Sequence, residues 1–371
     1  MAEVYFDNAA TTRPRPEVLQ VMAHAEEDSY FNTAAMYSGS IRTRKQVEEA
    51  AELILGRLTR NINAGQLIFT SGATEGNNIV IFGKITQARH HLVVLAGEHS
   101  STYAPSVALK NAGFPIDYIP LTPTGEADIH ALKKLIRPTT TLVCFSLVNS
   151  DTGTIQPVTE IVKVIRNIAP KAHIHVDAVQ GFCKLDFDVA DWKVDSVVLS
   201  AHKLYGPKGI GALWVRKGVT LRPVMYGGSQ QDYRPGTEAN ALIFGFAKAV
   251  QLFNTRASWE HVSALHKRLL SGLPKGCQVN GLNNNPYITN ILLPGVYGNT
   301  VMNALSSRGI FVGMGSACAA KASKNRTLLA MGMPEAKTKN VLRISFGIYN
   351  TPEEVDRFCR ELENTLAFLK T

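Results

Sequence analysis

The sequence has no apolar run that approaches the roughly 20 residues needed to cross a bilayer. Its first residues, MAEVYFDNAATT, lack the basic segment and following apolar segment of a secretory signal. Internal repeats, low-complexity tracts and long blocks of like charge are also missing. With 45% hydrophobic and 19% charged residues, the composition argues against disorder. We therefore expect a globular protein of the cytoplasm with no membrane association.

Cysteine pairs in the C-x-x-C spacing are absent, although the chain has five cysteines. Zinc or iron–sulfur ligation within the chain has no support, and we expect no metal site. An odd number of cysteines in a reducing compartment also argues against a disulfide framework. Each cysteine is then either a core residue or a reactive thiol. Four of them fit the core, and the exception is Cys318.

Acidic residues are fewer than basic ones, which gives a formal net charge of +9. The basic residues are scattered, with only short groups such as residues 42–45. A solvated basic surface explains this pattern, and a docking face for acidic partners is the alternative. No nucleic-acid-binding motif of the usual kinds is present.

Short apolar runs alternate with helical periods between about residues 66 and 217. QLIFT, HLVVLAG, TLVCFSLVN, HIHVDAVQ, SVVLSA and GALWVRKG are typical of strands that are buried on both faces. Residues 157–169 carry apolar side chains at helical spacing, which predicts a helix covering the sheet. The fold class is therefore α/β with a largely parallel central sheet.

The 371 residues are enough for two domains. We expect a large domain over residues 15–255 and a smaller C-terminal α/β domain over 256–371, with residues 1–14 packing on the smaller one. Helical segments and fewer strands alternate after residue 255. The last helix is marked by a capping box of Thr351 and Glu354, with Pro352 at its first position.

Polar residues follow the expected strands, at the sheet edge where open α/β proteins bind ligands. Small residues 71–74, which include Ala73 and Thr74, open a helix and predict a phosphate cradle. The other strand ends carry a histidine, an amide, a carboxylate and an amine: His99, Asn149, Asp177 with Gln180, and Ser200 with His202 and Lys203.

This set matches what pyridoxal phosphate (PLP) requires. An amine forms a Schiff base with its aldehyde, and a carboxylate pairs with the pyridinium nitrogen so that the ring withdraws electrons. Asp177 precedes Lys203 by 26 residues (203 − 177), about one crossover and a strand, which lets both face one crevice.

The chain resembles the fold-type I PLP enzymes of aminotransferase class V, and most closely the NifS/IscS-like cysteine desulfurases. The resemblance runs nearly from end to end through YFDNAATT, SGATEGNN, EH, DTGTIQPV, HVDAVQ, SAHKLYGPKGIGALWVRKG, PGTEAN, GSAC and LRISFG, in the order of the family. It implies a PLP-dependent transferase that converts L-cysteine to L-alanine and passes sulfur to an acceptor protein, as in iron–sulfur cluster assembly.

The resemblance also assigns roles around the cofactor. It implies that Lys203 is the Schiff-base lysine, that Asp177 pairs with the pyridine nitrogen and that His99 stacks on the ring. Gln180 would bond the phenolate oxygen, and Asn149 would lie beside the ring. Thr74, with its neighbour Ala73, would hold the phosphate together with Ser200, His202 and, from the other subunit of a homodimer, Thr237.

The same resemblance implies that Arg343 binds the substrate carboxylate and that Cys318 is the nucleophile that accepts sulfur as a persulfide. Arg343 suits this role because a guanidinium binds a carboxylate in bidentate fashion. Cys318 lies in a stretch of small residues without an apolar period, which favours a loop, and nearby basic residues favour its thiolate.

Departures from the usual family form all fall where substrate or partner would be recognised. They are NTAAMY at residues 32–37, Asp151 in place of a glutamate, YRPGTEAN, and GSACAAK. Two alternatives stay open. Another class V enzyme, such as a selenocysteine lyase or an aminotransferase, would not need Cys318. A non-catalytic scaffold on this fold would need neither Lys203 nor Arg343.

Overall fold

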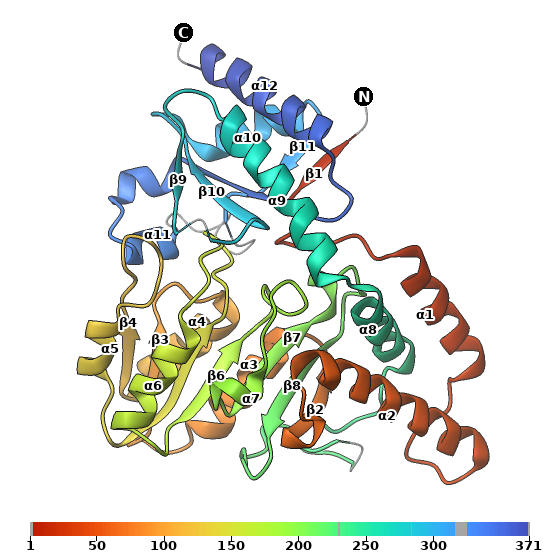
Figure 1. Ribbon diagram of the computed structural model, residues 1–371. Coiled ribbons are helices and arrows are strands. Elements are labelled where there is room, and N and C mark those ends of the chain that lie inside the picture. Colours follow the sequence, from red (N-terminus) through yellow and green to blue (C-terminus); the bar gives the residue numbers. More distant parts are fainter. Residues whose placement is uncertain (1–2, 229–230, 283, 316–324, 370–371) are drawn as a thin grey trace.

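The central sheet of the large lower part of Figure 1 has strand order β2-β8-β7-β6-β5-β3-β4. Figure 1 is a computed structural model, and it describes residues 3–228, 231–282, 284–315 and 325–369. All neighbouring strands pair in parallel except those next to β8, which is antiparallel to both β2 and β7. The strands are β2 (Gly65–Thr70), β3 (His91–Leu95), β4 (Ile116–Ile119), β5 (Thr140–Ser146), β6 (His173–Asp177), β7 (Ser196–Ser200) and β8 (Gly211–Arg216). The predicted mostly parallel sheet is confirmed.

Helices cover both faces of this sheet, which explains why its strands are apolar almost throughout. Along β3, Val93 packs with the helices on one face, whereas Leu92 and Val94 pack with those on the other. The first face carries α2 (Ser38–Leu58), α5 (Ile129–Leu135), α6 (Val158–Ile168), α7 (Val189–Trp192) and α8 (Asn240–Leu252). The second face carries α3 (Ala73–Lys84) and α4 (Ser100–Asn111). The helix expected over 157–169 is confirmed as α6.

A second hydrophobic core lies in the upper part of Figure 1, around two small sheets. One is antiparallel, with order β12-β10-β9, and the other is the parallel pair β1-β11. Their bounds are β1 (Val4–Phe6), β9 (Gln278–Asn280), β10 (Ile288–Leu292), β11 (Ile310–Val312) and β12 (Val341–Ser345). The helices of this part are α9 (Thr255–Gly272), α10 (Gly298–Ser306) and α12 (Pro352–Phe368).

The N-terminal strand β1 belongs to this second core although it begins the chain. Val4 and Phe6 are buried with residues of α9 and α12, and β1 pairs with β11. The chain then crosses to α1 (Pro16–Asp28), which packs on α8. Domain limits at residues 14 and 255 stay a prediction.

The last helix begins as its sequence predicts. The Thr351 side chain accepts a hydrogen bond from the Glu354 backbone N–H, and the Glu354 carboxylate accepts one from the Thr351 N–H. This capping box satisfies backbone donors that a helix N-terminus otherwise leaves unpaired.

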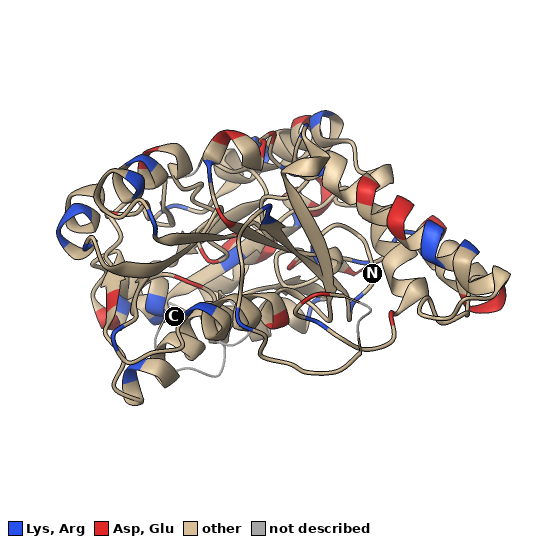
Figure 2. Cartoon of the chain, turned by 90° about the horizontal axis from the view of Figure 1, so that it is seen from below, with Lys and Arg blue, Asp and Glu red and all other residues tan. Residues whose placement is uncertain are grey.

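In the described part of the chain, no helix is long and apolar enough to cross a membrane. Figure 2 shows basic and acidic segments on helices at both ends of the molecule, so that the positive charge is not gathered into one patch on the face in view. Nor do three or more His, Cys, Asp or Glu side chains come together as a metal site among the described residues.

Candidate active site

A cavity of about 490 Å³ lies at the carboxyl ends of the parallel strands. Open α/β sheets bind their ligands at this edge, and small-molecule sites usually measure roughly 300–1,000 Å³. Most of the side chains predicted from the sequence line it: Ala73, Thr74, His99, Asp177, Gln180, Ser200, His202, Lys203 and Arg343.

One end of the cavity is suited to an anion. Ala73 and Thr74 are the first residues of α3, where backbone N–H groups have no partner within the helix and the helix dipole favours negative charge. Ser200 and His202 line the same cavity. Burial, followed by the nearby charge of Lys203, lowers the pKa of His202 to about 3, so the ring is neutral at pH 7.

Lys203 ends the short 3-10 helix Ala201–Lys203 that follows β7. Its Nζ donates hydrogen bonds to the carbonyl oxygens of Ala9 (2.6 Å) and Ala10 (2.7 Å). Burial, and then the positive charge of Arg343, lowers the pKa of Lys203 to about 7. A substantial fraction of this amine is therefore uncharged near neutral pH, the form that attacks a carbonyl carbon.

Asp177 is the last residue of β6, and its side chain is largely buried. Oδ1 accepts a hydrogen bond from the Val179 N–H (3.0 Å), and Oδ2 accepts one from Nδ2 of Asn77 (3.0 Å). These two hydrogen bonds fix the orientation of the carboxylate at the cavity edge, where a protonated ring nitrogen would pair with it.

His99 is the N-cap residue of α4. Its Nδ1 accepts a hydrogen bond from the Ser101 N–H (3.2 Å) and lies 2.8 Å from the Ser101 Oγ. Burial lowers the pKa of His99, and the ring is therefore neutral with its proton on Nε2.

The amide of Gln180 is oriented by two contacts. Its Oε1 accepts a hydrogen bond from Lys184 Nζ (3.3 Å), and its Nε2 donates one to the Ala9 carbonyl (2.9 Å). The second N–H of Gln180 Nε2 therefore remains at the cavity wall, where it is able to donate to an oxygen of a bound ring.

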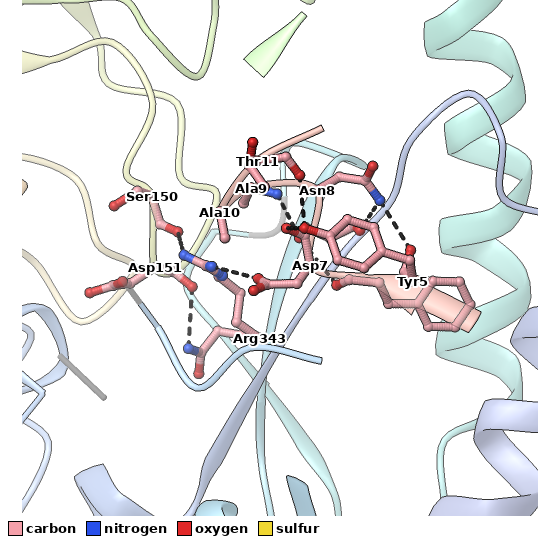
Figure 3. A network of polar contacts seen from close by, with 12 residues as sticks. Tyr5, Asp7, Asn8, Ala9, Ala10, Thr11, Ser150, Asp151 and Arg343 are labelled. Atoms are coloured by element: carbon pink, nitrogen blue, oxygen red, sulfur yellow. Dashed lines mark hydrogen bonds and ion pairs between the residues drawn. The ribbon is translucent and has the colours of Figure 1, made fainter. Parts of the chain in front are cut away.

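Arg343 lies in the middle of β12, on the side of the cavity that the small antiparallel sheet supplies, and its side chain is only 2% exposed. Figure 3 shows its guanidinium between two segments of the chain: Nη2 pairs with Asp7 Oδ1 (2.7 Å), and Nη1 donates to the Ser150 carbonyl (2.9 Å). Its Nε is buried without a hydrogen-bond partner among the described residues. The backbone of Gly313 approaches the ion pair closely, since a Cβ there would be 2.7 Å from Asp7 Oδ1 and 3.1 Å from Nη2.

Asn149 is buried but is not among the residues that line the cavity. Its Nδ2 donates to the Gly97 carbonyl (3.0 Å), and its Oδ1 accepts from the N–H groups of Asp151 (2.9 Å) and Thr152 (3.0 Å). The Asn149 side chain thus stabilises the turn of residues 149–152. The backbone carbonyl of Ser150, in this turn, accepts a hydrogen bond from Arg343.

Two further predicted residues, Thr237 and Cys318, are not part of the cavity as the described residues form it. Thr237 is exposed in the connection between β8 and α8. Cys318 lies outside the described residues. The segment that contains it is flanked by Gly315 and Asn325, which lie close together, because a Cβ on Gly315 would be 3.0 Å from Asn325 Nδ2.

The other cysteines are poor candidates for a nucleophile. Cys144, Cys183 and Cys359 are buried, and Cys277 is half-buried. Burial raises the pKa of the Cys144 thiol and raises the pKa values of Cys183 and Cys359 to about 11. Thiols in such surroundings are inert.

Sequence reasoning missed the N-terminal segment 7–12 as part of the site. Besides Asp7, Ala9 and Ala10, it supplies the Thr11 hydroxyl, 3.1 Å from His202 Nδ1. Its polar residues follow a short strand, DNAATT after VYF, and this was the signal available in the sequence.

The fold and the cavity define an open α/β enzyme with a half-buried lysine, a carboxylate and an anion-binding helix end at one site. The family profile "Aminotransferase class-V" matches residues 4–358. The sequence is 32% identical to "Cysteine desulfurase IscS 1" of Archaeoglobus fulgidus, over 99% of this chain and 98% of that protein. It is 34% identical to "Cysteine desulfurase IscS" of Clostridium botulinum, over 95% of this chain and 92% of that one.

Solved structures agree with these relatives. A "NIFS-LIKE PROTEIN" superposes with a TM-score of 0.91 at 31% identity, covering 99% of this chain and all of that one. A second structure, "SspA in complex with cysteine", has a TM-score of 0.83 at 31% identity and covers 94% of this chain and 100% of that one. The chain belongs to the aminotransferase class-V family, and within it to the NifS- and IscS-like cysteine desulfurases.

Proposed function

We propose that this enzyme converts L-cysteine to L-alanine with PLP as cofactor and leaves the sulfur as a persulfide on Cys318. The observation that supports this most directly is the gathering of Lys203, Asp177 and Arg343 around one cavity. An amine, a carboxylate and a carboxylate-binding guanidinium there match an amino-acid substrate and an aldehyde cofactor.

The residues present fit PLP by their chemistry. The N–H groups at the start of α3, with Ser200 and His202, would hold the phosphate. Asp177 would face the ring nitrogen, Gln180 the phenolate oxygen and His99 the ring face. When bound, the cofactor would supply an aldehyde and a ring that withdraws electrons from the substrate.

The chain's own groups would then carry the reaction. Arg343 would bind the substrate carboxylate through donors that Asp7 and Ser150 leave free. Lys203, with a pKa of about 7, would take the α-proton from the substrate and later return a proton to the product. Cys318, as the thiolate, would attack the substrate sulfur, so that the carbon–sulfur bond breaks while a sulfur–sulfur bond forms.

The finer parts of the proposal concern partners. In a homodimer, Thr237 of one subunit would contact the cofactor phosphate that is bound in the other subunit. An acceptor protein in the cytoplasm would take the sulfur from the persulfide. Asn149 would act beside the ring by holding the turn of residues 149–152, since its amide is occupied by that turn.

The test is a product analysis of purified protein supplied with PLP and L-cysteine. Alanine should form in an amount equal to the sulfane sulfur, counted as persulfide plus sulfide released by a thiol reductant. Keto acid in place of alanine would indicate an aminotransferase. Turnover of selenocysteine alone would indicate a lyase, and the absence of any product would leave the scaffold alternative.

A further inference from the structure

Asn77 lies on the inner face of α3 and is completely buried, outside the set of residues assigned above. Its Nδ2 donates to Asp177 Oδ2 (3.0 Å) and to Ser101 Oγ (2.9 Å), and its Oδ1 lies 2.8 Å from His175 Nε2. One side chain thus connects the carboxylate at the cavity edge with the residue that contacts His99.

The Asp177 carboxylate determines which atoms donate in the hydrogen bonds that run from Asn77 to His175 and beyond. A carboxylate only accepts, so the amide nitrogen of Asn77 faces it and the amide oxygen faces His175. The His175 Nε2 must therefore carry a proton. Burial lowers the pKa of His175 to about 3, which leaves Nδ1 to accept from the Ser196 hydroxyl (2.7 Å). The Ser196 oxygen in turn accepts from His173 Nε2 (2.7 Å).

The other side of Asn77 leads to His99 by the same reasoning. The Ser101 Oγ accepts from Asn77, so its own proton points to His99 Nδ1 (2.8 Å). The Ser101 N–H donates to the same nitrogen. His99 is thereby held as the tautomer with hydrogen on Nε2.

We propose that Asn77 is a positioning residue that fixes the Asp177 carboxylate and the His99 tautomer in one buried array. Without its amide, Asp177 loses one of its two donors, and the Ser101 hydroxyl is free to rotate away from His99. Buried polar groups that lose a partner are costly to leave unpaired, so the array holds as a unit. Its functional meaning rests on the proposed cofactor site, because Asp177 and His99 would contact the ring there.

Histidine tautomers test the array directly. The full-length protein, labelled with ¹⁵N-histidine, is studied by two-bond proton–nitrogen correlation spectra before and after PLP is added, with His99 and His175 assigned by their Gln variants. We expect both rings as the Nε2–H tautomer. Asn77→Ala should leave the Ser101 N–H as the one fixed donor to His99 Nδ1 and should shift both the His99 and the His175 signals. Asn78→Ala, at the half-buried neighbouring position, should change neither.

Ser101→Ala tests the contact with His99 separately from the contact with His175. It also provides a second test if Asn77→Ala fails to fold. It should alter the His99 signals and leave those of His175 unchanged. A wild-type His99 protonated on Nδ1, or a Ser101→Ala spectrum identical to wild type, would overturn the proposal.

The PLP dissociation constant gives a second measurement. Loss of one hydrogen bond to the Asp177 carboxylate should weaken binding about tenfold in Asn77→Ala, with Asn78→Ala at the wild-type value. Unchanged affinity in a folded Asn77→Ala protein would contradict the positioning role. If PLP binds neither variant nor wild type while the histidine spectra are as expected, the array stands and the proposed function fails.

Discussion

At one end of the cavity, Asp177 ends strand β6, and Lys203 follows the neighbouring strand β7 of the same sheet. At the other end, Arg343 meets Asp7, 336 residues away in sequence, and the carbonyl of Ser150, 193 residues away. The first end is built by a regular motif in which several parallel strands deliver side chains to the same edge. The second is assembled from three distant segments, and Asp151, one of the departures from the usual form of the family, directly follows Ser150 there.

The difference indicates which properties each end should control. The sheet end should determine whether the cofactor is held and the chemistry begins. The Arg343 end should determine which substrate is accepted and how well it binds. Variants at the two ends should therefore separate loss of turnover from loss of substrate affinity.

The largest effect is expected at the sheet end, from Lys203→Ala. Without its amine the protein should form no borohydride-stable link to PLP, and kcat should fall by about 10²–10⁴ because the general base is lost. Mass spectrometry after borohydride treatment and steady-state kinetics measure both. The exposed Lys217→Ala serves as control, and retention of the covalent link in Lys203→Ala would place the reactive amine elsewhere.

Arg343→Met should have the next largest effect, and mainly on KM. Removing the charge-assisted hydrogen bonds to the substrate carboxylate should lower kcat/KM for L-cysteine about 100-fold, or roughly 3 kcal/mol. PLP binding at the sheet end should persist. An Arg343→Met enzyme with unchanged KM would show that the substrate carboxylate binds at another group.

The pH dependence of cofactor incorporation should follow the pKa of Lys203. The pKa is lowered to about 7, so the neutral, reactive amine becomes dominant above pH 7. The rate of incorporation should rise about tenfold per pH unit below pH 7 and level off above it. A stopped-flow absorbance series measures this rate. A rise that continues to pH 10 would mean that the amine behaves as an ordinary lysine.

A smaller effect is expected from Gly313→Ala, which tests the Arg343 end without removing a functional group. The new Cβ would press on the Asp7–Arg343 pair, and overpacking of this kind destabilises by about 1–3 kcal/mol. We expect a KM raised several-fold and PLP affinity unchanged. Gly56→Ala, where a Cβ meets nothing within 4 Å, is the matched control, and equal KM values in the two variants would contradict the close packing at Arg343.

The sheet end could be predicted from sequence because its signals are local. Asp177 ends a buried strand, and His99 and Lys203 come within four residues of the end of one. Parallel strands bring such residues to one edge. Asn77 has no such signal, since a buried asparagine within a helix looks like any other until the fold sets it beside Asp177.

The Arg343 end could be predicted only through resemblance to a family. An arginine within an apolar strand is explained equally well by a core ion pair, and Arg343 does form one, with Asp7. Nothing in the spacing of the chain connects residues 7, 150 and 343, because long-range packing alone brings them together. Asn149 also could not be placed from the sequence alone. Its side-chain oxygen accepts hydrogen bonds from the N–H groups of Asp151 and Thr152, so it stabilises a turn and does not line the cavity.

The central claim is that sulfur leaves L-cysteine as a persulfide on Cys318, and intact-protein mass spectrometry tests it most directly. After a single turnover without reductant, the wild type and Cys277→Ser should gain one sulfur atom, located by peptide mapping at Cys318, with one alanine per site. Cys318→Ser should gain no sulfur and form no alanine, because a serine hydroxyl is a far weaker nucleophile than a thiolate. Cys318→Ser that produces alanine from L-cysteine at the wild-type rate would contradict the account.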